Sequence, residues 1–579
     1  MRYLKLTLLA VVAMVFTYCG NSESVTEELD AKGGKRYGGE FTFMSPERIS
    51  ILVPAYVGDI YNSRVISQIY EPLMAYDPNT ESVVPCVAES FTKSPDSKVY
   101  TFKIRTGVKF HDDKCFGKDS RELTAQDVKY TLEMACSGLE KNQVGHIFKL
   151  RIVGAEEFYQ QTVGKSTIPA SGVSGIKALD DQTLEITLLN PSPGFEVILT
   201  NPNLGIISKK AFQHYGGSIE KHAVGSGPFM LDKMTTEKVT LKRNPDYWKK
   251  DEFGNQLPFL ESIVVNHAKN KKSEMLAFRK GETDLVLEIP VENIENILGS
   301  LQEAQEGKNI KHKVDGEASM SMSYVAMAYD SDVFQDVRVR KAFNLAIDRN
   351  AIIDTWLEGE GWPAENGFAP KMSNYDNSSV TGHSYNVEKA QTLMRSAGHA
   401  NGAGFPTLDF YVNTKEGSGA HKMCQAIQQQ LKENININLN IKLCTLDERM
   451  KAIASGEAKI WRAGWVADYP APENFLGMFY GGNMGENGTS QMNPFNYRSD
   501  KFDELFEDAS REEDAEEREK LYQQCDQMVI DEGIVIPVLT DDHVVMINAR
   551  VRNFKASPLE SLNLTSVYIK KPLTEDQSN

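Results

Sequence analysis

One stretch of the chain predicts a strand, a helix and a second strand in succession. Residues 408–413, Leu-Asp-Phe-Tyr-Val-Asn, are rich in aromatic and β-branched residues and are expected to form a strand. A helix is expected around residues 422–432, and residues 435–441 alternate isoleucine or leucine with polar residues as a second strand. Two strands joined by a helix are normally parallel, with a right-handed crossover. This stretch is therefore expected to form a strand–helix–strand unit.

Further elements are predicted on both sides of this unit. Glu40-Phe-Thr-Phe alternates as a strand, and Thr124 with Asp127 three residues later is close to a capping box that begins a helix. The apolar positions of residues 337–349 repeat at helical spacing. Residues 500–530 form an acidic helical stretch, and the last strands are expected at 534–539 and 544–548.

The segment 462–476 combines opposite charges with aromatic rings and prolines. Its two closely spaced prolines are incompatible with a regular helix or a central strand, so a fixed loop is expected. Such a loop can hold a small zwitterion, with an ammonium on Asp468, a carboxylate on Arg462 and side chains against Trp465 and Tyr469. The alternative is a surface turn in which Asp468 caps a backbone group.

The N-terminal segment has the pattern of an export signal. Arg2 and Lys5 precede an apolar run, residues 6–16, that is too short to span a bilayer. The run ends at Cys19 in a sequence that resembles a bacterial lipobox. We expect a signal peptide over residues 1–18 and lipidation of Cys19, although Tyr18 departs from the usual small residue. The alternative is a plain secretory signal.

Residues 19–38 contain almost no apolar side chains, so they are predicted to be a flexible tether. A lipid, a tether and a globular body describe a protein that is exported to the cell envelope and held at the membrane by the lipid alone.

Charge and motif content exclude several classes of function. The net charge of −17 argues against nucleic-acid binding, which needs a basic surface. The sequence has no HExxH or GxSxG motif, and Gly164-Lys-Ser lacks the glycine that a phosphate loop requires at the position of Tyr159. It also has no CxxC pair. We therefore expect neither an enzyme nor a metal or cofactor site.

Two cysteines of the strand–helix–strand unit are candidates for a disulfide. Cys424 lies near the start of the predicted helix and Cys444 lies just past the second strand. The helix runs antiparallel to the strand, so both residues are expected at the same end of the unit, within bridging range. A pair of buried free thiols is the alternative.

Six short motifs follow one another along the chain. They are Tyr70-Glu-Pro-Leu, Tyr100-Thr-Phe-Lys-Ile-Arg-Thr-Gly-Val-Lys-Phe-His, Gly225-Ser-Gly-Pro-Phe, Asn244-Pro-Asp-Tyr-Trp, Arg340-Lys-Ala-Phe-Asn-Leu-Ala-Ile-Asp-Arg and Trp465-Val-Ala-Asp-Tyr-Pro. Together, and in this order, they resemble the family 5 extracellular solute-binding proteins, the oligopeptide- and dipeptide-binding receptors of ABC importers.

The resemblance implies an α/β, two-lobed, hinged fold of the periplasmic-binding-protein type, with an extra domain. The implied divisions are lobe 1 over 39–75, 200–315 and 536–579, the extra domain over 76–199, and lobe 2 over 316–535. A monomer is implied that captures peptides between its lobes and delivers them to the transmembrane subunits of an ABC permease. The same fold also binds nickel complexes, haem, opines and sugars, which remain the alternative ligands.

The resemblance also assigns roles at the binding site. Asp468 would receive the peptide ammonium, and Arg462 the carboxylate of a short peptide. Backbone groups of Gly464 and Val466 would pair with the peptide as an added strand. The remaining predicted contacts are the side-chain pocket at Trp465, the ring of Tyr469, and Ile60, which is expected in a loop of lobe 1. Packing in the hinge or core is the alternative for Trp465 and Tyr469.

Overall fold

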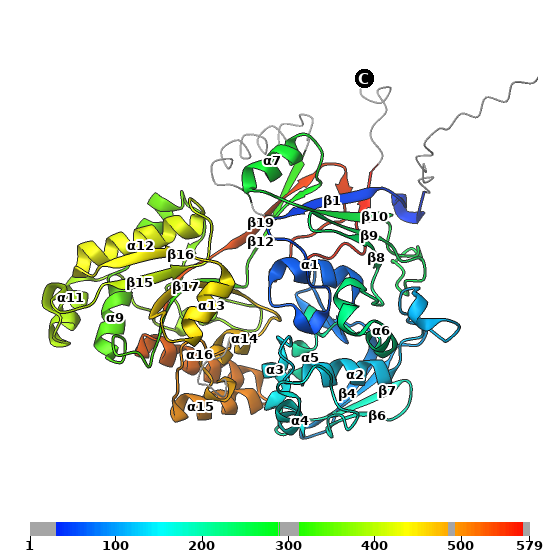
Figure 1. Cartoon of the computed structure of the whole chain (residues 1–579), viewed down its shortest axis with the longest axis horizontal. Coiled ribbons are helices and arrows are strands. Elements are labelled where there is room, and N and C mark those ends of the chain that lie inside the picture. Colours follow the sequence, from blue (N-terminus) through cyan, green and yellow to red (C-terminus); the bar gives the residue numbers. More distant parts are fainter. Residues whose placement is uncertain (1–29, 288, 290–311, 485–491, 571–579) are drawn as a thin grey trace, which may run out of the picture.

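The computed structural model describes residues 30–287, 289, 312–484 and 492–570, which form two lobes (Figure 1). The predicted signal peptide and the predicted lipidation site, Cys19, lie outside the described residues. No helix within the described residues is long and apolar enough to cross a bilayer.

Lobe 1 is built on a seven-stranded mixed sheet. Its central strand β1 is parallel to β10 and β11, while β9, β19 and β12 run antiparallel to their neighbours. The order across the sheet is β12 (His312–Ala318), β19 (Asp542–Asn548), β11 (Leu285–Val286), β1 (Glu40–Ser45), β10 (Ser262–His267), β9 (Lys238–Arg243) and β8 (Phe229–Met234).

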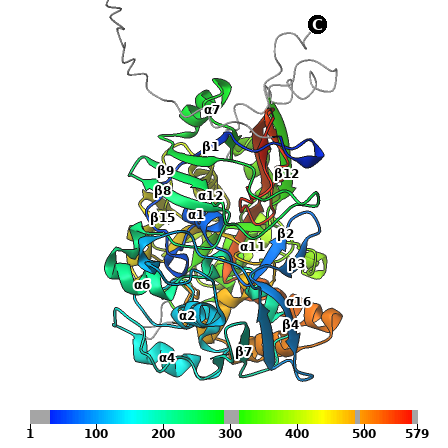
Figure 2. The same ribbon diagram turned by 90° about the vertical axis from the view of Figure 1, so that its right-hand side faces the viewer.

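A four-stranded antiparallel sheet lies at the end of lobe 1 farthest from β1 (Figures 1 and 2). Its order is β4 (Ala88–Lys93), β5 (Val99–Ile104), β7 (Thr183–Thr187) and β6 (Ile176–Ala178). One continuous hydrophobic cluster joins this region to the seven-stranded sheet, so the two belong to one lobe. Its helices are α1 (Ile60–Ile69), α2 (Ala125–Ala135), α3 (Gly145–Lys149), α4 (Ala155–Thr162), α5 (Phe195–Ile198), α6 (Lys209–Tyr215) and α7 (Lys271–Arg279). Small ribbons pair β2 (Met74–Asp77) with β3 (Ser82–Pro85) and β20 (Val551–Arg552) with β21 (Tyr568–Ile569).

Lobe 2 is a six-stranded sheet with helices on both faces. Alternate residues of its strands face two separate hydrophobic clusters, as the period of a strand requires. The strand order is β14 (Trp362–Pro363), β18 (Val535–Thr540), β13 (Ser321–Met327), β17 (Ile460–Val466), β15 (Leu408–Val412) and β16 (Leu439–Leu443). One face packs on α9 (Val337–Leu345), α11 (Val387–Ser396) and α12 (Gly419–Ile435), and the other on α13 (Leu446–Ala454), α14 (Glu473–Leu476), α15 (Asp500–Arg511) and α16 (Ala515–Glu532).

The chain crosses between the lobes twice. It leaves the seven-stranded sheet after β12, enters the six-stranded sheet at β13, and returns between β18 and β19. The backbone N–H of Ser319 donates to the carbonyl of Asp541 at 2.9 Å, so the two crossings lie side by side. That of Met320 donates to the carbonyl of Pro558 at 2.8 Å.

The predicted helix start at Thr124 and the predicted parallel strands are confirmed. Thr124 and Asp127 form the capping box of α2, and β15 and β16 are parallel. The predicted helix over 337–349 is interrupted, because Asp348 caps a separate short helix, α10 (Arg349–Ala351). Asp514 likewise caps α16 and divides the acidic stretch into two helices.

Two other predicted segments differ from the structure. Residue 435 ends α12 rather than beginning a strand, because Asn436 adopts φ 55° and stops the helix. The expected tether is ordered in its second part: the N–H of Lys32 donates to Asn255 Oδ1 at 2.9 Å, and Lys35 pairs with Glu252 at 2.8 Å. A polar loop of lobe 1 supplies these contacts, which composition alone does not reveal.

The predicted Cys424–Cys444 disulfide is not formed. Both residues are free thiols. Cys424 packs on the face of the six-stranded sheet that α12 covers, whereas Cys444 packs against the cluster on the opposite face. The sheet therefore lies between the two side chains.

Candidate functional site

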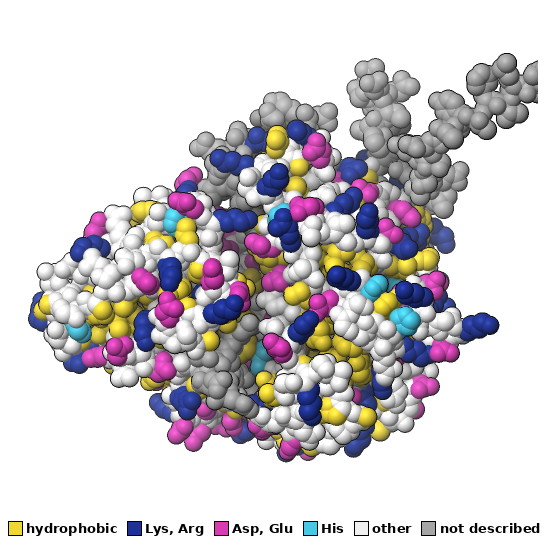
Figure 3. Space-filling view, viewed as in Figure 1, with side chains coloured by type: hydrophobic (Ala, Val, Ile, Leu, Met, Phe, Trp, Pro, Cys, Tyr) yellow, Lys and Arg dark blue, Asp and Glu magenta, His cyan; other side chains and the backbone are white. Residues whose placement is uncertain are grey.

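A cavity of about 490 Å³ lies between the two lobes. Figure 3 shows the hollow that separates them on the surface. Lobe 1 contributes the first turns of α1, the segment around Glu71 and the loop 561–565. Lobe 2 contributes β17 and the residues that follow it, together with Asn413 and Arg449. A ligand in this cavity would touch both lobes.

The end of β17 presents an unpaired edge to the cavity. One edge of β17 pairs with β13 along its whole length, from Ile460 to Val466. The other edge pairs with β15 only as far as Arg462. In the part of the chain that the structure describes, residues 463–466 therefore have one edge free of strand partners. The prediction of a fixed loop over 462–476 is wrong for residues 462–466, which belong to β17. The prolines begin only at residue 470 and leave the strand intact.

Asp468 lies just beyond this strand and lines the cavity. Burial raises the pKa of its carboxyl to about 6, and a hydrogen bond from Asn474 acts in the opposite direction. The side chain retains some exposure to the cavity, yet the described residues provide no ion pair for it. The carboxylate is thus costly to ionise until a cation is supplied.

Asn474, which no sequence motif indicated, holds Asp468 in place. It is 2% exposed, and its Oδ1 accepts from the Trp465 indole N–H at 2.8 Å and from the Asp468 backbone N–H at 3.1 Å. Its side chain also bonds the Asp468 carboxyl. The sequence offered one signal for Asn474, a side-chain amide two residues after Pro472 within the aromatic segment 462–476. Only the fold shows its three contacts.

Arg462 bends along the strand toward Gly464. A Cβ added at Gly464 would lie 3.3 Å from Arg462 Nη2 and 3.7 Å from Cζ, so the guanidinium covers the glycine. Nη2 donates to Ser323 Oγ at 3.2 Å. The buried Nε has no hydrogen-bond partner among the described residues.

Arg449 is a second cation at this end of the cavity and was missed by the sequence analysis. Its guanidinium donates to Asn413 and, at 2.8 Å, to the carbonyl of Arg462. Burial, with the nearby charge of Arg462, lowers the pKa of Arg449. Its Nε is also buried without a partner among the described residues. Two guanidiniums without a described carboxylate partner leave this end of the cavity positively charged.

The two carboxylates that lobe 1 contributes to the cavity wall already have hydrogen-bond donors. Asp59 caps α1 and accepts from the backbone N–H of Asn62 at 2.9 Å. Glu71 accepts from Tyr247 Oη at 2.6 Å and from Trp248 Nε1 at 2.8 Å, and Lys249 lies 4.0 Å away. Asp468 is therefore the carboxylate of the cavity best placed to take a cation from a ligand.

The structure brings six of the seven predicted site residues to one cavity: Ile60, Arg462, Gly464, Trp465, Val466 and Asp468. Ile60 is the first residue of α1, which Asp59 caps, rather than part of a loop. Tyr469 does not line this cavity. Its ring packs into the hydrophobic cluster of lobe 1, and its hydroxyl donates to Glu473 Oε1 at 3.2 Å.

A two-lobed α/β fold with a ligand-sized cavity between its lobes is the architecture of a solute-binding receptor. Residues 82–487 match the family described as bacterial extracellular solute-binding proteins, family 5 Middle, and the chain belongs to this family.

Relatives in the family carry names for different solutes. The dipeptide-binding protein of Escherichia coli (strain K12) is 25% identical over 87% of this chain and 89% of the relative. Heme-binding protein A of Haemophilus influenzae is 26% identical over 96% of this chain and 97% of the relative. Among solved structures, the periplasmic binding protein DppA of Helicobacter pylori in complex with the peptide STSA has a TM-score of 0.76 and 27% identity, covering 92% of this chain and 99% of that one.

Proposed function

We propose that this protein is the peptide-binding receptor of an ABC importer. The observation that carries the proposal is the arrangement along β17: a carboxylate without an ionic partner at Asp468, an unpaired strand edge, and two guanidiniums with orphaned donors at Arg449 and Arg462. An extended peptide supplies an ammonium, backbone donors and acceptors, and a carboxylate in that order.

Each of the six predicted residues that line the cavity has a role in this proposal. Asp468 receives the ammonium, and backbone groups of Gly464 and Val466 pair with the peptide along the free edge. Arg462, with Arg449 beside it, receives a carboxylate. Trp465, held by Asn474, borders a side-chain pocket, and Ile60 approaches from lobe 1. The complex of the Helicobacter pylori relative with a tetrapeptide supports this class of ligand.

Closure of the lobes would follow from ligand contact with both walls. A ligand that touches both lobes favours the closed state by its difference in affinity for the two states. The adjacent crossings after β12 and β18 would form the hinge. The closed, loaded monomer, exported and anchored through Cys19, would then deliver its peptide to the permease subunits, and no residue would serve in catalysis.

A haem or another non-peptide solute is the alternative, since one relative is named a haem-binding protein. The unpaired carboxylate favours an amine-bearing ligand over a dianionic porphyrin.

Native mass spectrometry of the purified protein tests the proposal. Wild-type protein should carry co-purified species with peptide masses, and Asp468→Asn protein should lose them. Ser63→Ala is the control, because Ser63 lines the same cavity from lobe 1 and the change leaves Asp468 and Arg462 untouched. Recovery of haem or of a solute without an amine would refute the peptide assignment.

A further inference from the structure

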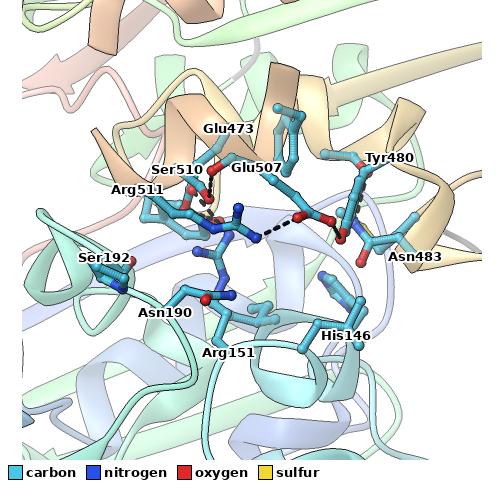
Figure 4. Close-up of a pocket in the computed structure, with 17 residues that line it drawn as sticks. His146, Arg151, Asn190, Ser192, Glu473, Tyr480, Asn483, Glu507, Ser510 and Arg511 are labelled. Atoms are coloured by element: carbon cyan, nitrogen blue, oxygen red, sulfur yellow. Dashed lines mark hydrogen bonds and ion pairs between the residues drawn. The ribbon is translucent and has the colours of Figure 1, made fainter. Parts of the chain in front are cut away.

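A second cavity, of about 240 Å³, lies where the four-stranded-sheet region of lobe 1 meets lobe 2 (Figure 4). Arg151, just beyond α3 of lobe 1, points across it toward Glu473 in α14 of lobe 2. Arg151 Nη2 lies 3.0 Å from Glu473 Oε2, and the two side chains keep 20% and 10% of their exposure. The pair is therefore largely removed from water and bridges the two lobes.

Lobe 2 holds Glu473 ready for this contact. Tyr469 donates to Oε1 at 3.2 Å, and Tyr522 of α16 donates to Oε2 at 3.3 Å. The other acid of the cavity, Glu507, is bonded within lobe 2 by Arg511 and by Tyr480 at 2.7 Å. Among the described charged residues that line this cavity, Arg151 and Glu473 make the ion pair that joins one lobe to the other.

The ion pair is adjacent in sequence to Asn474, the residue that holds Asp468 in place. Glu473 precedes Asn474, whose side chain holds Trp465 and the Asp468 backbone. Tyr469 follows Asp468 and buries its ring in the hydrophobic cluster of lobe 1. The anchor segment is thus fixed from lobe 1 on one side while it faces the ligand cavity on the other. Neither Arg151 nor Glu473 lines the ligand cavity.

We propose that Arg151 and Glu473 are positioning residues of the binding site, forming a latch across the lobes that stabilises the closed state and holds Asp468 toward the ligand. The inference rests on the proposed capture of ligand between the lobes. Removing one member leaves a desolvated charge without its partner, which disfavours the closed state. Because closure and binding are linked, ligand affinity then falls although no ligand contact has been removed.

Small-angle X-ray scattering and calorimetry together test the latch. Scattering is compared between wild type and variant in both the ligand-free and the peptide-saturated state, and Arg151→Met should increase the radius of gyration in at least one of them. The same variant should weaken binding of the tetrapeptide STSA by roughly ten- to hundredfold. The double variant Arg151→Glu with Glu473→Arg, which exchanges the two charges, should restore part of the compactness and part of the affinity for STSA. Arg121→Met is the matched control, since Arg121 pairs with Asp246 at 2.7 Å inside lobe 1.

The outcomes separate the latch from the peptide assignment. Wild-type scattering and wild-type affinity in Arg151→Met would overturn the latch. Failure of the wild type to bind STSA would count against this peptide as a ligand, while the scattering comparison would still decide the latch. If Arg151→Met does not fold, Glu473→Gln, which keeps the size of the side chain and removes the charge, replaces it in both measurements.

Discussion

Ligand affinity should fall as the pH is lowered from 7 to 5. The reason is Asp468, whose pKa burial raises to about 6 in the ligand-free protein. An ammonium binds the ionised carboxylate and not the protonated acid. At pH 7 roughly nine-tenths of the molecules carry the ionised form, whereas at pH 5 roughly one-tenth do, so the apparent affinity should drop about tenfold. An aspartate with an ordinary pKa, near 3.9, would give almost no change over this range.

Other groups should not obscure the effect. A peptide's own ammonium and carboxylate titrate near 8 and 3.5, outside the range. His146, which also lines the cavity, has its pKa lowered to about 4 by burial and by Arg151, so it stays neutral between pH 5 and 7.

Isothermal titration calorimetry with STSA at pH 5, 6 and 7 measures the affinity. Repeating each titration in buffers of different ionisation enthalpy counts protons, and binding should release about half a proton at pH 6 and nearly one at pH 5. In Asp468→Asn the residual affinity should be independent of pH. A flat profile for the wild type, with no proton release, would refute the assignment of the ammonium to Asp468.

Three more predictions concern single positions. Asp468→Asn should weaken peptide binding by roughly a hundredfold or more. It should also stabilise the ligand-free protein at pH 7 by about 1–3 kcal/mol, because the raised pKa means that the ionised form is disfavoured in the fold; denaturant melts should show this gain above pH 6 and its loss below about pH 4. Gly464→Val should displace the Arg462 guanidinium that covers the glycine and cost about 1–3 kcal/mol of binding for a free peptide, but little for its C-terminal amide. Cys19→Ser should abolish labelling by a palmitate analogue, and equal labelling of both proteins would contradict lipidation.

Much of the fold follows from patterns that local physics controls. The strand-forming residues at 408–412 and the cap at Thr124 predict elements because each signal depends on neighbours in sequence. The break at Asp348 was missed because a cap inside an apolar repeat competes with helix continuation. A helix and a strand can both accommodate Ile435, and only the positive φ of Asn436 decides between them.

The candidate site could be predicted where one segment of the chain supplies its residues. Arg462, Gly464 and Asp468 share β17 and its extension, so sequence order gives their order in the cavity. Arg449 could not be found in this way, because α13 brings it to the carbonyl of Arg462 from outside the segment. Tyr469 was misplaced because a residue next to an anchor can point to either lobe, and burial against lobe 1 decided it.

The two adjacent crossings also determine which part of the molecule can move relative to its surroundings. The backbone that enters lobe 2 is hydrogen-bonded at Ser319 to the backbone that leaves it at Asp541. Lobe 2 is therefore an insertion into lobe 1 that would turn about one pivot. The first described residues dock on lobe 1 through Lys32 and Lys35, and β21 near the last described residue belongs to it as well. A tether at the N-terminus would therefore immobilise lobe 1, and each capture event would be a swing of the distal lobe against a stationary base.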